Sequence, residues 1–246
     1  MRIRFFALAA LALSLAACTQ DEAGFLPEGA EGTPIVFTAT GLNPAATAIA
    51  ATRAPADGNW TGVQSVAVMM DGTVSVGGVV GVQRDGSITG CSSSATVKGT
   101  LNVGGVAGQT IFGATLTACY ATGNVIIEID RTQNISGGGL VGFNDGISLL
   151  SCYATGNVTS TGSSTGYVHI GGFLGNNYAN VMTACYWKNN HEQGIGYNKK
   201  STEATKVDGS VVTWQKAVDA MNTALQNAGS KWRYELKGAL PTLRKQ

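Results

Sequence analysis

Two identical strings lie 33 residues apart in this chain, Cys119-Tyr-Ala-Thr-Gly-Asn-Val125 and Cys152-Tyr-Ala-Thr-Gly-Asn-Val158. A third copy begins Cys185-Tyr186-Trp187, and Cys91 opens a degenerate copy 28 residues before Cys119. A glycine cluster precedes each of these cysteines by 14 or 15 residues. The clusters are Gly77-Gly-Val-Val-Gly81, Gly104-Gly-Val-Ala-Gly108, Gly138-Gly-Leu-Val-Gly142 and Gly171-Gly-Phe-Leu-Gly175. Recurrence in phase at one spacing is the mark of a structural repeat.

The repeat length and its residue types predict an all-β fold. A period near 30 residues with short β-type runs and no helical pattern favours one solenoid turn per repeat. Glycine suits the corners, where the backbone must turn sharply or approach closely. We therefore expect a right-handed parallel β-helix of about four turns over residues 76–198, in which like positions stack about 4.8 Å apart.

Stacking places the repeated cysteines and tyrosines in two columns. Successive side chains of a strand point to opposite faces, so one column faces inward and the other outward. We expect the cysteines inside, because a free thiol packs as a small apolar group. Disulfides between adjacent turns remain an alternative, whereas the spacing excludes a zinc site. The inward column is Cys91, Cys119, Cys152 and Cys185.

The outward tyrosine column is the first candidate for a binding surface. A stacked aromatic stripe can hold sugar rings or protein side chains. The same rings could equally serve as structural ladder residues. The column consists of Tyr120, Tyr153 and Tyr186.

Composition excludes several functions for the 246-residue chain. It has 34 glycines, only 13% charged residues and a net charge of +1, so it has no overall basic footprint for nucleic acid. Two histidines cannot build a His-rich metal site. We expect no metal and no cofactor. The one pair of nearby carboxylates on a strand, Glu128 and Asp130, precedes Arg131 and fits a solvated ion pair better than acid–base catalysis.

The N-terminus predicts export and lipid attachment. Arg2 and Arg4 precede a short apolar run, which ends in Leu15-Ala-Ala-Cys18. Residues 1–17 therefore fit a lipoprotein signal peptide, with Cys18 as the acylated residue. Two or more acyl chains would anchor Cys18 stably in outer-membrane lipid. Residues 18–33 predict a flexible tether. The acids after Cys18 resemble the surface-export signal of Bacteroidota lipoproteins, which implies a surface-exposed location.

The strings Gly139-Leu-Val-Gly142 and Cys152–Val158 resemble the GLUG repeat, named for Gly-Leu-hydrophobic-Gly. That family is frequent in surface proteins of gut Bacteroides and also occurs in streptococcal IgA-cleaving metallopeptidases. The resemblance covers about residues 76–190. It does not imply peptidase activity, because His191-Glu192 is not followed by the second histidine of a His-Glu-x-x-His zinc helix. His169 lies in a β-type run and is expected to be a surface or ladder residue.

Residues 34–75 resemble the first strands of the fimbrillin-like β-sandwich family of the same bacteria. The matching features are the runs at 35–38 and 66–69 and the string around Arg53-Ala54. Only about 40 residues precede the repeats, too few for a complete sandwich. The resemblance implies an N-terminal β segment capping the solenoid, with the Arg53–Ala54 bond as a processing site and fimbrial subunits as partners. An ordinary exposed loop at that bond is the alternative.

Residues 199–246 predict a C-terminal cap. Apolar residues recur at helical spacing over residues 213–228, with Thr213 as N-cap and Gly229 at the end. We expect this helix to cover the last open turn, because an uncapped solenoid end exposes unpaired strands.

Taken together, the sequence predicts a non-enzymatic, lipid-anchored outer-membrane protein that displays a binding solenoid, with a glycan or a host or matrix protein as ligand. Two other functions stay open. One is a fimbria-associated or structural envelope component, favoured by residues 34–75. The other is a polysaccharide-active β-helix enzyme, for which no acidic cluster with Arg or Lys is evident.

Overall fold

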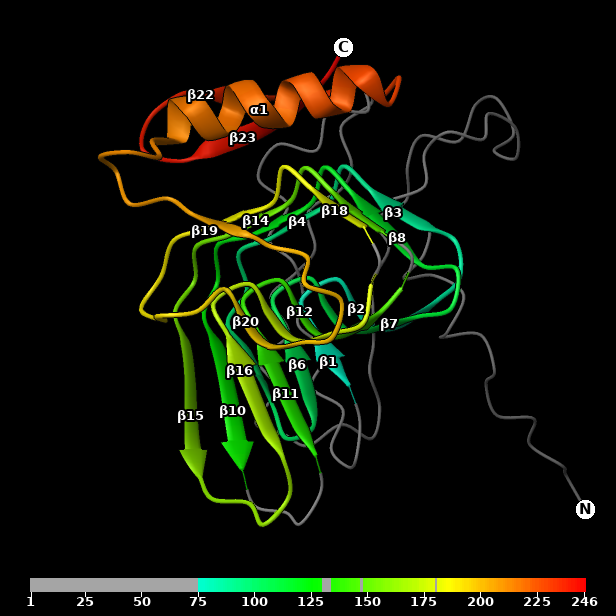
Figure 1. The fold of residues 1–246 in the computed structure, drawn as a ribbon, viewed down its shortest axis with the longest axis vertical. Coiled ribbons are helices and arrows are strands. Elements are labelled where there is room, and N and C mark those ends of the chain that lie inside the picture. The colour runs from blue at the N-terminus through cyan, green and yellow to red at the C-terminus, as the bar shows by residue number, and fades with distance from the viewer. Residues whose placement is uncertain (1–74, 130–133, 147, 180) are drawn as a thin grey trace, which may run out of the picture.

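The computed structural model describes residues 75–129, 134–146, 148–179 and 181–246. Over these ranges the chain is an all-β parallel solenoid with one helix near its C-terminus, as the repeats predict (Figure 1). The signal peptide, the tether and the N-terminal β segment fall in residues 1–74, outside the described residues. Cys18, Arg53 and Ala54 are therefore not placed.

Each solenoid turn contributes short strands to the same series of parallel sheets. The first turn is β1 (Val76–Gly77), β2 (Val80–Arg84), β3 (Ser87–Thr89), β4 (Ser92–Ser93) and β5 (Val97–Gly99). The second is β6 (Asn102–Gly104), β7 (Ala107–Ile111), β8 (Thr115–Thr117), β9 (Tyr120–Ala121) and β10 (Val125–Ile129). The third is β11 (Ile135–Gly138), β12 (Val141–Asp145), β13 (Ser148–Leu150), β14 (Tyr153–Ala154) and β15 (Val158–Gly162).

The later turns are shorter. The fourth is β16 (Val168–Gly171), β17 (Leu174–Asn177), β18 (Val181–Thr183) and β19 (Tyr186–Trp187), and a partial fifth adds β20 (Ile195–Asn198) and β21 (Thr205–Lys206). The five sheets run β1-β6-β11-β16, β2-β7-β12-β17-β20, β3-β8-β13-β18, β4-β9-β14-β19-β21 and β5-β10-β15. Later turns lie nearer the viewer in Figure 1, and the chain runs counter-clockwise toward the viewer, which is a right-handed coil.

In cross-section the solenoid has two parts, which we call the arm and the body (Figure 1). The arm consists of the β1-β6-β11-β16 and β5-β10-β15 sheets, whose facing side chains form a core of valine and isoleucine. The body consists of the three remaining parallel sheets around a second core, which contains Leu116, Leu140, Phe173 and the cysteine column. The arm and the body therefore bury separate apolar cores, and the chain passes between them in every turn.

The glycine clusters join the arm to the body by close backbone contact. A Cβ atom added at Gly142 would lie 2.5 Å from the backbone nitrogen of Val103, and one added at Gly104 would lie 2.7 Å from the backbone nitrogen of Gly142. Cβ atoms essentially never approach that closely. The same contact recurs in other turns, at Gly108 against Val76 and at Gly175 against Gly137. We call this stack of contacts the glycine corner.

A polar column runs through the interior beside the glycine corner. Asn144 accepts a hydrogen bond from Thr110 at 2.5 Å and donates one to Asn177 at 2.8 Å, and Asn177 donates to Asn198 at 3.0 Å. These residues occupy one register position of successive turns. Since buried amides are costly unless paired, the column fixes the turn-to-turn register.

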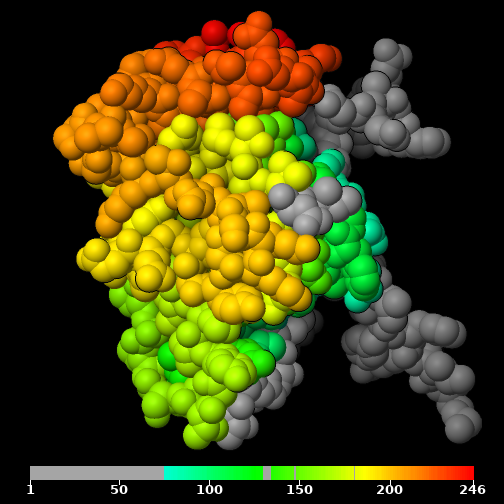
Figure 2. Space-filling view, viewed as in Figure 1, coloured from blue at the N-terminus to red at the C-terminus, as the bar shows by residue number. Residues whose placement is uncertain are grey.

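The C-terminal region forms a layer on the side of the solenoid, not on its end. Helix α1 (Trp214–Asn227) begins after the N-cap Thr213, and β22 (Trp232–Leu236) and β23 (Pro241–Lys245) form an antiparallel hairpin. This C-terminal layer lies over the outer face of the β4-β9-β14-β19-β21 sheet (Figures 1 and 2). The prediction that it covers the last open turn is wrong. The outward tyrosines make that side apolar, while β20 and β21 pair with the strands of the fourth turn.

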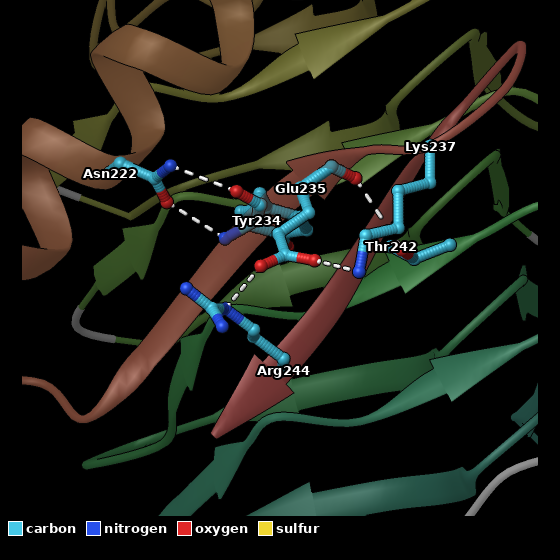
Figure 3. A network of polar contacts seen from close by, with 6 residues as sticks. All are labelled: Asn222, Tyr234, Glu235, Lys237, Thr242 and Arg244. Carbon is cyan, nitrogen blue, oxygen red and sulfur yellow. Dashed lines mark hydrogen bonds and ion pairs between the residues drawn. The ribbon is translucent and has the colours of Figure 1, made fainter. Parts of the chain in front are cut away.

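Polar contacts hold the C-terminal layer together (Figure 3). The Asn222 side chain on α1 donates to the carbonyl of Tyr234 at 2.9 Å and accepts from its backbone N–H at 2.7 Å. Glu235 pairs with Arg244 across the hairpin and with Lys237 at 2.6 Å. Among the described ranges, no helix combines the length and the hydropathy that crossing a bilayer requires.

Substitution at the glycine corner tests its structural role. Gly142→Ala is expected to lower the free energy of unfolding by about 3 kcal/mol, because the new methyl group meets backbone on two sides. Gly209→Ala is the matched control: Gly209 has a positive φ but nothing within 4 Å of an added Cβ, so we expect a loss of about 1 kcal/mol. Urea unfolding measures both, and equal losses would contradict a steric role for the corner.

Candidate functional site

The cysteine column lies inside the body. Cys119, Cys152 and Cys185 are buried free thiols, and Cys91 occupies the same core. Each of the three free thiols faces backbone carbonyls of its own turn and of the preceding turn. Cys119 Sγ, for example, lies 3.3 Å from Thr117 O and 3.4 Å from Ile88 O. Burial, with the neighbouring thiols, raises the pKa of Cys152 well above its usual value. A thiol held protonated in this way is a packing residue and a poor nucleophile.

The tyrosine column lies on the opposite side of the strands, and the C-terminal layer covers it. The rings of Tyr120 and Tyr153 stack with centroids 4.7 Å apart and planes 3° apart. Tyr153 has no exposed surface, and Trp214 packs edge-on against it at 5.1 Å. Tyr120 and Tyr186 are half-buried in the same apolar cluster. The prediction that the tyrosine column is an exposed binding surface is therefore wrong. These rings pack against the C-terminal layer instead.

Buried hydroxyl groups fix that docking. Tyr153 Oη donates to the carbonyl of Pro241, and Tyr234 Oη donates to the carbonyl of Ser151 at 2.9 Å. Ser151 Oγ in turn donates to the carbonyl of Met221 on α1 at 2.9 Å. Burial raises the pKa of both tyrosine hydroxyls. The column and the C-terminal layer thus share one hydrogen-bonded interface.

A second aromatic surface, distinct from the tyrosine column, is exposed to solvent. A hollow of about 570 Å³ lies in the angle between the arm and the body, flanking the glycine corner. Two register columns line it. The column from the arm contains Asn102, Ser136 and His169. The column from the body contains Gln109, Phe143, Asn176 and Tyr197. We call this hollow the corner groove.

Aromatic rings cross the corner groove as a continuous series. Centroid distances are 6.0 Å from Tyr167 to His169, 5.0 Å from His169 to Tyr197, 6.0 Å from Tyr197 to Tyr178 and 5.7 Å from Tyr178 to Phe143. Tyr167 is 71% exposed and Tyr197 is 41% exposed, so both residues are accessible to solvent. The series spans the third, fourth and fifth turns. The sequence predicted an exposed aromatic surface at the tyrosine column. The structure has such a surface in this ring series instead.

Amides and hydroxyls fill the rest of the corner groove. Asn102 donates to Ser75 at 3.2 Å, and Ser75 donates to the side-chain oxygen of Gln109 at 3.2 Å. The Asn176 side chain is 93% buried by area, yet its Oδ1 atom has no hydrogen-bond partner among the described residues. Burial lowers the pKa of His169, which favours its neutral form. No Lys, Arg, Asp or Glu is among the described residues that line the groove.

Groove residues of the column from the body can be recognised in the sequence by their position after a corner glycine. Their residue types alone do not identify them. Gln109, Phe143, Asn176 and Tyr197 each follow a glycine of the corner, namely Gly108, Gly142, Gly175 and Gly196. The residue after the last glycine of the second, third and fourth clusters, and the residue after Gly196, is therefore a groove position. His169, expected as a surface or ladder residue, lies in the wall from the arm.

Glu128, one of the two nearby carboxylates expected on a strand, lies in a solvated ion pair. Glu128 pairs with Lys98 of the preceding turn at 2.6 Å, and both side chains are about half exposed. Asp130 and Arg131 lie outside the described residues. Within the described part of the chain, no three His, Cys, Asp or Glu side chains are grouped to hold a metal ion.

Comparison with protein families agrees with the repeat geometry. The family described as the GLUG motif matches residues 72–98 and 133–159, the first and third repeats. Two of the four repeats are therefore similar to the GLUG motif. In the third repeat, Gly142 of the motif lies in the glycine corner, and the following residue, Phe143, enters the corner groove. No curated protein and no solved structure matches the chain.

Thiol labelling tests the burial of the cysteine column in the GLUG repeats. In the folded chain at pH 8, Cys119, Cys152 and Cys185 are expected to resist iodoacetamide, because burial denies the reagent access to all three, and the raised pKa of Cys152 also suppresses its thiolate. In urea all three should react within the same time. Mass spectrometry of tryptic peptides measures the labelled fraction, and rapid labelling of Cys152 in the folded chain would contradict this placement.

Alkaline unfolding tests the tyrosine interface. Tyr153 and Tyr234 have raised pKa values when folded, so the stability they contribute is complete below pH 10 and is lost as pH rises above 10. Each should lower the free energy of unfolding by about 1.4 kcal/mol per pH unit above the unfolded tyrosine pKa of about 10.

Tyr234→Phe should therefore reduce that slope by about 1.4 kcal/mol per pH unit, because phenylalanine does not ionise. Tyr167→Phe, at a ring that is 71% exposed, serves as the control and should leave the slope unchanged. Urea titrations at pH 9 to 11 give the slopes. A slope that Tyr234→Phe does not change would contradict burial of this hydroxyl.

Proposed function

We propose that the protein is a non-enzymatic, lipid-anchored cell-surface protein whose GLUG-repeat solenoid binds an external ligand. The observation that carries the binding role is the corner groove, an open hollow lined by rings and amides. Rings and amides orient a bound molecule, and rigid walls reduce the entropy lost on binding. Backbone ladders in five parallel sheets make those walls rigid.

The anchoring part of the proposal rests on the sequence. The Leu15-Ala-Ala-Cys18 string supplies a lipobox-like cleavage site, and the polar residues from Thr19 onward would hold the solenoid away from the lipid. The N-terminal attachment leaves the solenoid free to face the exterior. The outer membrane, with the solenoid outside the cell, is the location that this proposal assigns.

Protease shaving of intact cells tests location and anchoring together. A C-terminal tag should be lost from intact cells that make the unaltered chain, because the solenoid lies outside. The Cys18→Ala variant should leave the membrane fraction, since it lacks the acylated thiol. Lysed cells control for cleavability of the tag. Protection in intact cells with loss in lysed cells would place the solenoid in the periplasm and overturn the proposal.

A further inference from the structure

We propose that the corner groove binds a neutral glycan chain, running along the solenoid axis across the third, fourth and fifth turns. This inference rests on the proposed function, because it names the ligand class of the same groove. It goes further by committing to sugars that carry no charge, held by stacking and by amide hydrogen bonds.

The stacking contribution comes from the ring series. The C–H faces of a sugar ring pack against aromatic faces, which carry the negative side of the ring quadrupole. Tyr167 and Tyr197, the two most exposed rings of the series, lie on either side of His169. Because neighbouring centroids are 5.0–6.0 Å apart, a chain of sugar rings can rest on several of them at once.

The hydrogen-bonding contribution comes from the amide wall. An amide side chain offers both donors and acceptors, as a sugar hydroxyl does. Asn176 carries a buried oxygen without a partner among the described residues, and it lies between Phe143 and Tyr197 in the column from the body. A buried acceptor left unsatisfied costs about 1–3 kcal/mol, and rotation of the Asn176 amide toward a ligand hydroxyl would remove that cost.

The described residues that line the groove include no Lys, Arg, Asp or Glu, and this favours an uncharged ligand over a polyanion. A nucleic acid or a uronate polymer needs cationic side chains to neutralise its charges, and none is among the described residues of the groove. Burial disfavours the cationic form of His169, so this ring adds no fixed charge. Lys199 lies 4.8 Å above the ring of Tyr178, at the margin of the ring series.

The architecture of the walls disfavours an extended peptide. A peptide that binds by strand addition takes its affinity from main-chain hydrogen bonds to an open sheet edge. The corner groove is instead walled by sheet faces, whose strands already pair with the turns before and after them. The side chains of this surface can stack against a ligand and form amide hydrogen bonds with it. A neutral glycan uses both.

The test is a binding panel with the full chain in detergent. The probes are neutral oligosaccharides with gluco-, manno- and galacto-configured repeats, acidic glycans that carry uronate or sulfate, and matrix proteins. We expect binding to at least one neutral class, with an affinity that changes little between 50 and 500 mM salt, about the range over which ionic contacts are lost. Tyr197→Ala and Tyr167→Ala should each weaken it about tenfold.

Phe112→Ala is the matched control, because Phe112 is a 59% exposed aromatic ring outside the groove lining. It should leave the affinity unchanged. Thermal unfolding of each variant verifies the fold, and Tyr167→Ala remains informative if Tyr197→Ala fails to fold.

The outcomes separate the two claims. Neutral-glycan binding that Tyr167→Ala and Tyr197→Ala leave unchanged would overturn the inference, as would binding confined to acidic glycans and lost in salt. Binding of a matrix protein through Tyr197, with no glycan bound, would overturn the inference but keep the proposed function. A folded chain that binds no probe would count against both.

Discussion

Close contact between glycine backbones at the corner is the constraint on which this structure depends. In each turn the chain must leave the arm and enter the body, and it does so where Gly104 meets Gly142 and where Gly108 meets Val76. A side chain at these positions would force the two sheets apart. The apolar core of the arm, made of valine and isoleucine, and the separate core of the body, which contains leucine and phenylalanine, lie on the two sides of this corner. The same contact creates the angle that holds the corner groove.

The repeat period and the residue types predicted much of the fold, because every turn of a solenoid has the same arrangement of short strands. Cysteines and tyrosines in adjacent positions had to fall on opposite faces, and they do so in Cys152 and Tyr153. The helix at 213–228 was predictable from its apolar spacing, and the structure places α1 at Trp214–Asn227. These features depend on contacts between neighbours in the sequence or between like positions of successive repeats.

The location of the C-terminal layer was not predictable from that reasoning. Its docking depends on contacts across 70 or more residues, such as Ser151 with Met221 and Tyr153 with Pro241. A stacked tyrosine column looks the same in sequence whether solvent or a second layer covers it. The groove was not predictable for a related reason: its rings come from non-equivalent positions, and the glycine corner is what brings Tyr197 of the body to His169 of the arm. The residues that directly follow Gly108, Gly142, Gly175 and Gly196 can be recognised as groove positions only once the corner geometry is known.

Native-state hydrogen exchange tests the central claim most directly, namely that the glycine corner couples the arm and the body into one unit. The measurement follows peptides covering 103–108, 137–142 and 170–175, together with the arm strands β10 and β11 and the body strands β12 and β13. The account predicts that the corner peptides exchange only with global unfolding, and that the arm and the body share that free energy. Exchange of the arm in a separate, lower-energy step, with the corner peptides unprotected, would contradict it.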